Sequence, residues 1–269
     1  MRKYYTRACN FYYGVTAKDL IKKKLALSLC GKKNIAFDNI EILSRNKLTK
    51  RINIRNIKKL PKQVKKIILV DIKNITSKRK NLNKYTNISE PLIMGVLNLT
   101  PDSFSDGGLY NKTYKAFRHI ADMISGGADI IDIGAESTRP GSKDIPHEIE
   151  WKRLENVISN FKKKFPKVFL STDTRKSDVM LKAIKYKSDL INDVSGFKYD
   201  SKAIEKIKNY DVWKVLHHMQ GTPNNMQINP TYKNVLLDIY DFFEKKIDVD
   251  FKKFKYKKFI IDPGIGFGK

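Results

Sequence analysis

The chain has 269 residues, of which 41% are hydrophobic and 11% aromatic, and it carries a formal net charge of +26. The hydrophobic content is typical of a globular protein with a core, and the length allows one large α/β domain or a domain with an appendage. The charge suggests nucleic-acid binding, but the lysines are interleaved with Asn and Ile along the chain. We therefore expect no specific nucleic-acid partner and only weak, salt-dependent attraction to polyanions.

Cysteine usage and hydropathy exclude further classes. Cys9 and Cys30 give neither a zinc-ligand spacing nor a disulfide framework, which indicates a reducing cytosol. Residues 22–31 imitate a lipoprotein signal, but the apolar run is short and Leu29 stands where a small residue should precede the cysteine. No apolar run approaches the ~18 residues that span a bilayer. We expect a soluble, cytoplasmic protein.

Residues 1–90 predict a small α/β extension that ends in a linker. Segments 34–45 and 64–72 are expected to be short strands, and segment 17–29 a helix. The linker is the polar and basic stretch 74–90. No motif with recognisable chemistry lies in this part.

Residues 91–269 alternate apolar, strand-like runs with amphipathic, helix-like segments. This alternation predicts a parallel sheet with right-handed crossovers, and the continuous apolar character of the strands indicates that both faces are covered. The predicted strands are 92–97, 128–134, 167–172, 188–193, 212–217 and 257–262. The predicted helices are 113–127, 145–165, 175–186, 200–210 and 232–254.

Polar residues at the ends of the strands decide between two sheet architectures. They are Asn98, Asp132, Glu136, Asp173, Asn192, Asp193, His217, His218 and Asp262. A doubly wound sheet concentrates its chemistry at one switch point, whereas a barrel gathers it from nearly every strand. We therefore predict a (β/α)8 TIM barrel after the extension. Only six βα units precede Lys269, so the barrel is expected to be incomplete, with a truncated C-terminus.

The stretch MGVLNLTPDSFSDGG, residues 94–108, lies in a segment from Pro91 to Tyr110 that holds no basic residue, in a chain with 54 Lys and Arg. Its Asn, Asp, Thr and Ser oxygens suit Mg²⁺, which keeps water and shares substrate phosphates. Lysine would compete with the metal there. The alternative is a polar turn in which Asp102 and Ser103 cap a helix, but the density of oxygen ligands favours a functional loop.

Two further loops contain glycine. In GAESTRPG, residues 134–141, Thr138 and Arg139 present a hydroxyl and a guanidinium group to a phosphate. The alternative is a surface arginine on a flexible loop. GIGFGK, residues 264–269, is not a Walker phosphate loop, because Pro263 stands where the first glycine should be. Its glycines are expected to let the backbone approach a ligand closely.

Three polar side chains that end predicted strands suit a flat heterocycle with amino and ring N–H donors: Asp173, Asn192 and Asp262. Each one alone would be explained by capping of the following helix. Met219 is placed to pack on a planar ligand. His217 and His218 are adjacent on a strand and point to opposite faces. We expect a structural or hydrogen-bonded histidine there rather than a metal site.

Together these motifs resemble those of dihydropteroate synthase. NLTPDSFSDGG, GAESTRPG, STDT, LINDVSG, HMQGTP and DPGIGFGK occur in the family's order over residues 91–269, and the first 90 residues resemble an extension of some bacterial members. The resemblance implies a barrel that joins 6-hydroxymethyl-7,8-dihydropterin diphosphate to p-aminobenzoate, releasing diphosphate and 7,8-dihydropteroate. It also implies Mg²⁺ as cofactor, small-molecule substrates and a homodimer.

The resemblance assigns roles to individual residues. At the reacting centre it places Phe104, Asp106 and Arg139. As substrate-binding residues it implies Thr138, Arg139, Asp173, Asn192, Met219, Asp262 and Phe267. Asn98 would hold Mg²⁺ at the diphosphate. No protein nucleophile is needed, because a neutralised diphosphate is a good leaving group.

The family's later strands supply a Lys and an Arg/His pair, and these lie beyond Lys269. We therefore expect the 269-residue chain to be inactive or nearly so on its own. A pterin-barrel methyltransferase is the competing enzyme class, but it has no need of a diphosphate loop. Two non-enzymatic hypotheses also stand, a non-specific nucleic-acid-binding protein and a non-catalytic paralogue.

Overall fold

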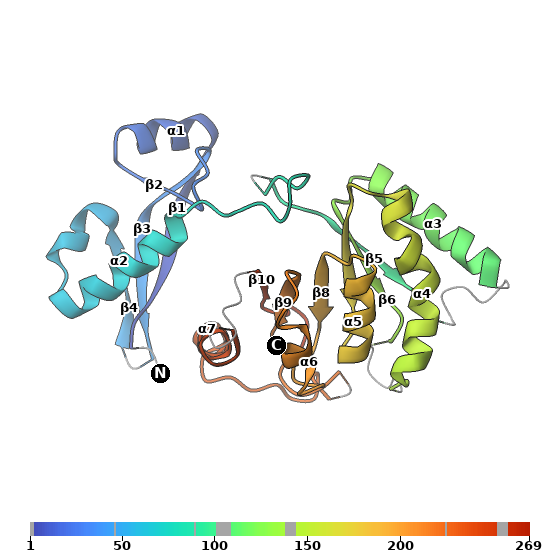
Figure 1. The fold of residues 1–269 in the computed structure, drawn as a ribbon. Coiled ribbons are helices and arrows are strands. Elements are labelled where there is room, and N and C mark those ends of the chain that lie inside the picture. The colour runs from blue at the N-terminus through green and yellow to red at the C-terminus, as the bar shows by residue number, and fades with distance from the viewer. Residues whose placement is uncertain are drawn as a thin grey trace. The chain divides into compact units, whose positions relative to one another are not determined.

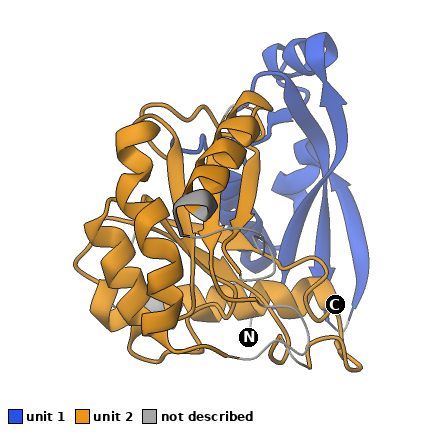
Figure 2. Ribbon diagram, turned by 90° about the vertical axis from the view of Figure 1, so that its right-hand side faces the viewer, with its two compact units in different colours: residues 1–81 blue, residues 82–269 orange. Residues whose placement is uncertain are grey.

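The computed structural model describes residues 3–45, 47–88, 90–100, 109–137, 144–223, 225–251 and 258–269. The chain divides into two compact units, residues 1–81 and residues 82–269 (Figure 2). None of the helices in these described ranges is both long and apolar enough to cross a bilayer.

The first unit is a small antiparallel sheet with helices. In chain order it contains β1 (Tyr5–Tyr13), α1 (Gly14–Lys22), β2 (Leu27–Ser28), β3 (Ile35–Ser44), β4 (Lys47–Asn53), the 3₁₀ helix η1 (Ile54–Lys59) and α2 (Lys62–Thr76). β3 pairs with β1 along one edge and with β2 and β4 along the other. Its core joins Phe37 and Ile40 of the sheet to Ile68 and Ile72 of α2.

Three expectations for this unit have different outcomes. Segment 34–45 is a strand, as predicted. Segment 64–72 is helical, so the predicted strand is wrong, and the buried Ile68, Asp71 and Ile72 show the three- and four-residue spacing of one helix face. The helix predicted over 17–29 ends early, because the chain after α1 leaves the helix and Leu27–Ser28 pairs with β3.

The second unit alternates strands and helices. Its elements are β5 (Met94–Asn98), α3 (Leu109–Ser125), β6 (Ile130–Gly134), α4 (His147–Lys164), β7 (Phe169–Asp173), α5 (Ser177–Lys185), β8 (Leu190–Asp193), α6 (Ala203–Ile207), β9 (Trp213–His217), α7 (Val235–Lys246), the π-helical η3 (Ile247–Phe251) and β10 (Phe259–Asp262). The six strands lie in the order β10-β9-β8-β7-β6-β5, and every pair is parallel (Figure 1). All six predicted strands are confirmed, each within two residues of its expected bounds. Within the described residues the sheet stays open between β5 and β10.

Alternation along the strands separates two faces of this sheet. Ile131, Ile133, Leu170, Ile191 and Leu216 point outward and form the main core with the helices. The residues between them point to the inner face, which is apolar at the amino ends of the strands and polar at the carboxyl ends.

The amino ends of the strands are covered by the segment that precedes β5. Leu82 and Leu92 pack on the inner-face cluster, and the Trp213 indole N–H donates to the Leu82 carbonyl at 2.9 Å. Residues 82–90, which the sequence assigns to a linker, therefore belong to the second unit. This packing closes one end of the sheet and leaves the polar end for a ligand.

Candidate functional site at the carboxyl ends of the strands

The pairing register aligns the predicted site residues across neighbouring strands. Asn98, Gly134, Asp173 and Asn192 lie directly opposite one another on β5, β6, β7 and β8. Residues that are directly opposite share one face of a sheet, so all three polar side chains project from the inner face. Sequence reasoning could predict this row because the strand ends of a parallel sheet meet at one edge.

Asp132 lies one layer below this row on β6. Its Oδ2 accepts a hydrogen bond from Asn192 Nδ2 at 2.9 Å, while its buried Oδ1 has no hydrogen-bond partner among the described residues. Burial raises the pKa of the Asp132 carboxyl above its ordinary value. The hydroxyl of Ser171, which lies directly opposite on β7, and the amide of Asn192 oppose that rise.

Asp173 is the most strongly perturbed carboxyl of the site. Burial, followed by the negative charges of Asp132 and Asp193, raises the pKa of Asp173 well above its ordinary value. The described residues give the Asp173 carboxyl no hydrogen bond, and its side chain lies against the bare backbone of Gly134, where a Cβ would meet Oδ2 at 3.2 Å. Asp193 is different, because it accepts backbone N–H groups of Ser195 and Phe197 and fixes the loop after β8.

Asp262 on β10 belongs to a second polar group. Its Oδ2 contacts His217 Nδ1 at 3.0 Å and its Oδ1 accepts the Gly264 N–H at 2.8 Å. The hydrogen bond with His217 lowers the pKa of Asp262. The Phe267 ring stands edge-on to the buried His217 imidazole, with 4.8 Å between ring centroids. His217 is thus hydrogen-bonded, as the sequence predicts, and it orients a carboxylate of the site.

Two of the three glycines in residues 264–269 are required by the chain's own packing, and the expected approach of a ligand stays a prediction. A Cβ at Gly264, where φ is +66°, would lie 2.1 Å from the His218 carbonyl oxygen. A Cβ at Gly268 would lie 2.8 Å from the Gln220 carbonyl oxygen. At these two positions the close approach of the chain's own backbone requires glycine.

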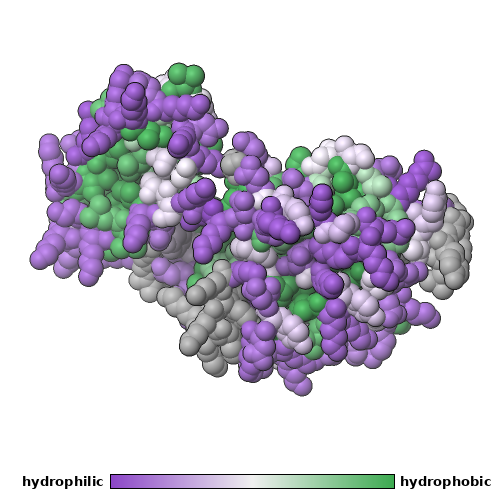
Figure 3. All heavy atoms as spheres, turned by 45° about the horizontal axis from the view of Figure 1, so that its top comes forward, coloured by the Kyte–Doolittle hydropathy of each residue, from purple (hydrophilic) through white to green (hydrophobic). Residues whose placement is uncertain are grey.

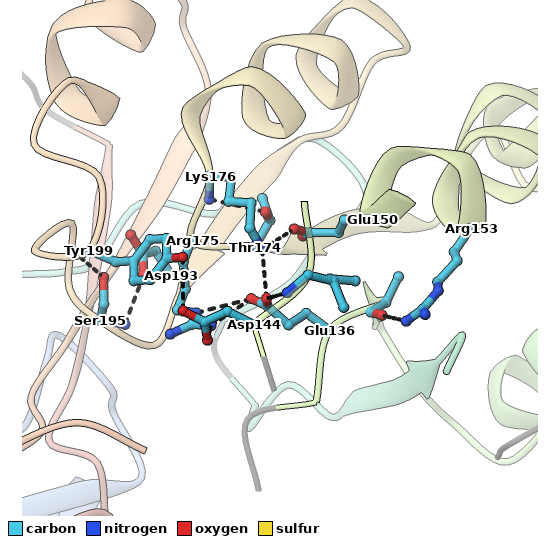
Figure 4. A network of polar contacts seen from close by, with 12 residues as sticks. Glu136, Asp144, Glu150, Arg153, Thr174, Arg175, Lys176, Asp193, Ser195 and Tyr199 are labelled. Carbon is cyan, nitrogen blue, oxygen red and sulfur yellow. Dashed lines mark hydrogen bonds and ion pairs between the residues drawn. The ribbon is translucent and has the colours of Figure 1, made fainter. Parts of the chain in front are cut away.

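An ion-pair network borders the site (Figure 4). Arg175, just after β7, contacts Glu136 at 2.7 Å and Asp144 at 3.0 Å, and its guanidinium group lies 4.2 Å from the centre of the Tyr199 ring. The Tyr199 hydroxyl donates to Asp144. Arg175 therefore joins Glu136 and Asp144, the carboxylates before and after residues 138–143.

Lys176 extends the network into the protein. Its Nζ lies 2.6 Å from Glu136 and 2.7 Å from Glu150, and both carboxylates are buried. Although burial opposes it, the hydrogen bonds from Lys176 and Arg175 lower the pKa of Glu136. Sequence reasoning missed these pairs, because in a chain with 54 Lys and Arg an Arg-Lys dipeptide carries no signal.

Met219 is buried and lines a pocket of about 250 Å³ beside this network. Arg175, Ser195, Tyr199 and Thr222 contribute further walls. Four predicted site residues lie outside the described residues: Phe104, Asp106, Thr138 and Arg139. Among the described ones, the structure brings Asp173 and Asn192 together and pairs Asp262 with His217 and Phe267 as a separate group.

The fit of the site to Mg²⁺ depends on Asn98. The described residues contain no cluster of three or more His, Cys, Asp or Glu side chains that would hold a metal by itself. Asn98 is exposed at the end of β5, where its amide oxygen is accessible. Mg²⁺ often takes one or two protein oxygens and fills its other positions with water and substrate phosphates. Asn98 fits that shared mode of binding.

The second unit matches a known family. The family model for pterin binding enzymes covers residues 94–269, which is more than half of the chain. The chain belongs to this family. The dihydropteroate synthase of Escherichia coli (strain K12) is 38% identical over 184 residues, which cover 68% of this chain and 64% of the relative.

Two crystal structures of family members extend the comparison. The Yersinia pestis dihydropteroate synthase with a sulfonamide drug matches with a TM-score of 0.62 and 39% identity, over 68% of this chain and 66% of that one. The Xanthomonas albilineans enzyme with 4-aminobenzoic acid matches with a TM-score of 0.60 and 36% identity, over 67% and 63%. These likenesses confirm both the resemblance and the TIM-barrel fold class, of which the described residues form six strands. The chain spans 64% of the length of the E. coli family member.

Proposed function

We propose that this chain carries the pterin site of a dihydropteroate synthase, which condenses 6-hydroxymethyl-7,8-dihydropterin diphosphate with p-aminobenzoate in folate biosynthesis. The observation that supports it most is the Asp173 carboxyl, an inner-face acceptor that receives no hydrogen bond from the described residues and whose pKa is raised by burial and by the charges of Asp132 and Asp193. A pterin carries an amino group and a ring N–H along one edge, and these donors match acceptors that the fold leaves unsatisfied.

Neighbouring groups supply the rest of pterin recognition. Asn192 is held by Asp132 through its Nδ2, which leaves its carbonyl oxygen as an acceptor for the ligand. Asp262 is held ionised by His217 and so offers a further acceptor. Met219 and Phe267 provide polarisable and aromatic surface for the flat ring and for the aminobenzoate.

The reaction itself needs leaving-group stabilisation and exclusion of water. The methylene–oxygen bond breaks with its electron pair going to the diphosphate, the amine nitrogen bonds to the methylene carbon, and the amine proton passes to solvent. When bound, Mg²⁺ neutralises charge on the diphosphate, and Asn98 is the described residue that would hold it. Phe104, Asp106, Thr138 and Arg139 are proposed for the reacting centre and the diphosphate on their motifs alone.

Calorimetry with pterin diphosphate and Mg²⁺ tests the proposal on the chain itself. We expect saturable binding that is weakened at least about tenfold in Asp173→Asn and kept in Asp122→Asn, a matched change at an exposed carboxylate on α3. A methyltransferase-type pterin site would bind pterin equally well with and without the diphosphate. Failure of the unaltered chain to bind either ligand would contradict the proposal.

A further inference from the structure

The positive charge of the protein is concentrated in the first unit. Residues 1–81 contain 23 Lys and Arg against four Asp and Glu, a net charge of +19. Residues 82–269 contain 31 against 24, a net charge of only +7 in more than twice the length. The even spread of lysines expected along the chain is therefore wrong once the two units are separated.

A general preference for lysine does not explain this difference. Such a preference acts on the whole chain, and the second unit shows its result: many lysines that are nearly balanced by carboxylates. The first unit has a higher density of cations, 23 in 81 residues against 31 in 188, and far fewer anions, four against 24. The second unit is thus an internal control, and the missing carboxylates are the feature that needs a function.

The cations of the first unit are accessible and far outnumber its carboxylates. Of its 22 described Lys and Arg residues, 19 are exposed and none is buried. The four carboxylates already have local partners: Asp19 with Lys23, Asp38 with Asn10, Glu41 with Arg7 and Asp71 with Thr6. Figure 3 shows hydrophilic side chains over much of this unit, around a hydrophobic patch.

The densest part is the stretch 47–66, which we call the basic stretch. It holds nine Lys and Arg and no Asp or Glu, and it runs through β4, η1 and the first turn of α2. Lysines on an edge strand such as β4 also prevent edge-to-edge pairing, but that role does not extend to η1 and α2. At the start of α2 the lysines oppose the helix dipole, since no acidic residue lies in its first turn. The lysines at the start of α2 therefore lower the stability of the first unit slightly.

We propose that the first unit binds single-stranded nucleic acid through its phosphates, without sequence preference, along the basic stretch. The exposed cations of the basic stretch follow one another along a strand, a 3₁₀ helix and the start of an α-helix, and a flexible polyanion can follow such a stretch. In the same unit β1 exposes Phe11 and Tyr13, at 39% and 65%, and exposed aromatic rings can stack with unpaired bases. This activity is independent of the pterin site.

Fluorescence anisotropy with the full chain tests the proposal. The probe is a labelled RNA of about 20 nucleotides, longer than the ~4–16 nucleotides that one single-strand-binding module covers. One variant changes Lys50, Lys58, Lys59 and Lys62 to Gln, all exposed in the basic stretch. The matched control changes four exposed lysines of the second unit to Gln: Lys152, Lys163, Lys185 and Lys202. Both variants lose the same net charge, and circular dichroism checks that both fold.

The salt dependence gives the expected size of the effect. Each phosphate contact that is lost reduces the steepness of log K against log salt by about 0.7. A slope of about 0.7 means that one contact makes the binding constant about fivefold higher at ~0.1 M salt than at ~1 M salt. Loss of four contacts therefore lowers the slope by about 3 and the affinity by up to about 600-fold, while the control stays close to the unaltered chain. Equal weakening of both variants would overturn the proposal, as would RNA binding too weak to detect at low salt. Binding of anionic vesicles instead of RNA, sensitive to the same four lysines, would overturn it in favour of a membrane surface.

Discussion

Replacing Asp173 by Asn should stabilise the fold and weaken pterin binding, two effects of opposite sign. The carboxylate is buried beside Asp132 and Asp193, which raises its pKa, and no side-chain hydrogen bond of the described residues depends on it. A purely structural aspartate would behave differently, because its loss would lower stability. The sign of the stability change therefore separates the two roles.

The size of the gain follows from proton linkage. Each unit by which the fold raises a carboxyl pKa costs about 1.4 kcal/mol of stability at pH above the raised value. The neighbouring Asp193, whose pKa is raised from 3.8 to about 6, loses about 3 kcal/mol in this way. Removal of the Asp173 charge should raise the melting temperature, by about 2–4 °C for each kcal/mol gained in a unit of this size. The direction of the pH dependence follows from the raised pKa of Asp173 in the folded state. As the pH rises above about 4, the unfolded chain ionises Asp173 more readily than the folded chain does, so the unaltered protein loses stability. Asp173→Asn has no such loss.

The assay is thermal unfolding at about pH 3, where an ordinary Asp is mostly protonated, and at about pH 8, where it is fully ionised, with Asp122→Asn as the control. The advantage of Asp173→Asn should be close to zero at the acidic end and largest at pH 8. Calorimetry should show pterin affinity reduced about 10- to 150-fold, the loss of a hydrogen bond worth about 1.5–3 kcal/mol to a charged group. Destabilisation at pH 8, or an advantage that does not change with pH, would refute the reasoning.

Three further predictions concern other groups. Lys214 is buried on β9, and burial lowers its pKa to about 8. Lys214→Met should therefore add about 3 kcal/mol to the free energy of unfolding at pH 7 and nothing above about pH 10.5. Urea unfolding at these two pH values checks this, and an equal gain from the exposed Lys167→Met would contradict it. His217→Phe should raise the pKa of Asp262 toward its ordinary value, seen by carboxyl NMR titration, and an unchanged titration would disprove the contact. Asn98→Ala should weaken Mg²⁺-dependent binding of pterin diphosphate about 10-fold, a loss of about 1.4 kcal/mol, and leave diphosphate-free pterin unaffected, as calorimetry with each ligand would show.

Several expectations stay predictions. The lack of turnover by the 269-residue chain, the homodimer and the roles of Phe104, Asp106, Thr138 and Arg139 are not tested by the described residues. Turnover assays on the chain and sedimentation in solution address the first two directly.

The sequence by itself determined the repeating architecture of the second unit and the position of its polar strand ends. Apolar runs buried on both faces are a local signal, and the polar residue that follows each run is visible without any partner. For this reason Asn98, Asp173, Asn192 and Asp262 were predicted individually and lie on the inner face. The prediction of a strand over 64–72 was wrong because a short apolar run suits a strand and a helix equally well. Only packing against Phe37 and Ile40 selects the helix.

Only the tertiary structure decided which of these groups meet. The contact of Asn192 with Asp132 spans 60 residues and that of His217 with Asp262 spans 45, and such separations leave no periodic trace in a sequence. The same holds for Arg175, which joins Glu136 to Asp144. Local patterns specify which residues end a strand, but burial and mutual repulsion, which set the charge of Asp173, exist only when distant segments are packed together.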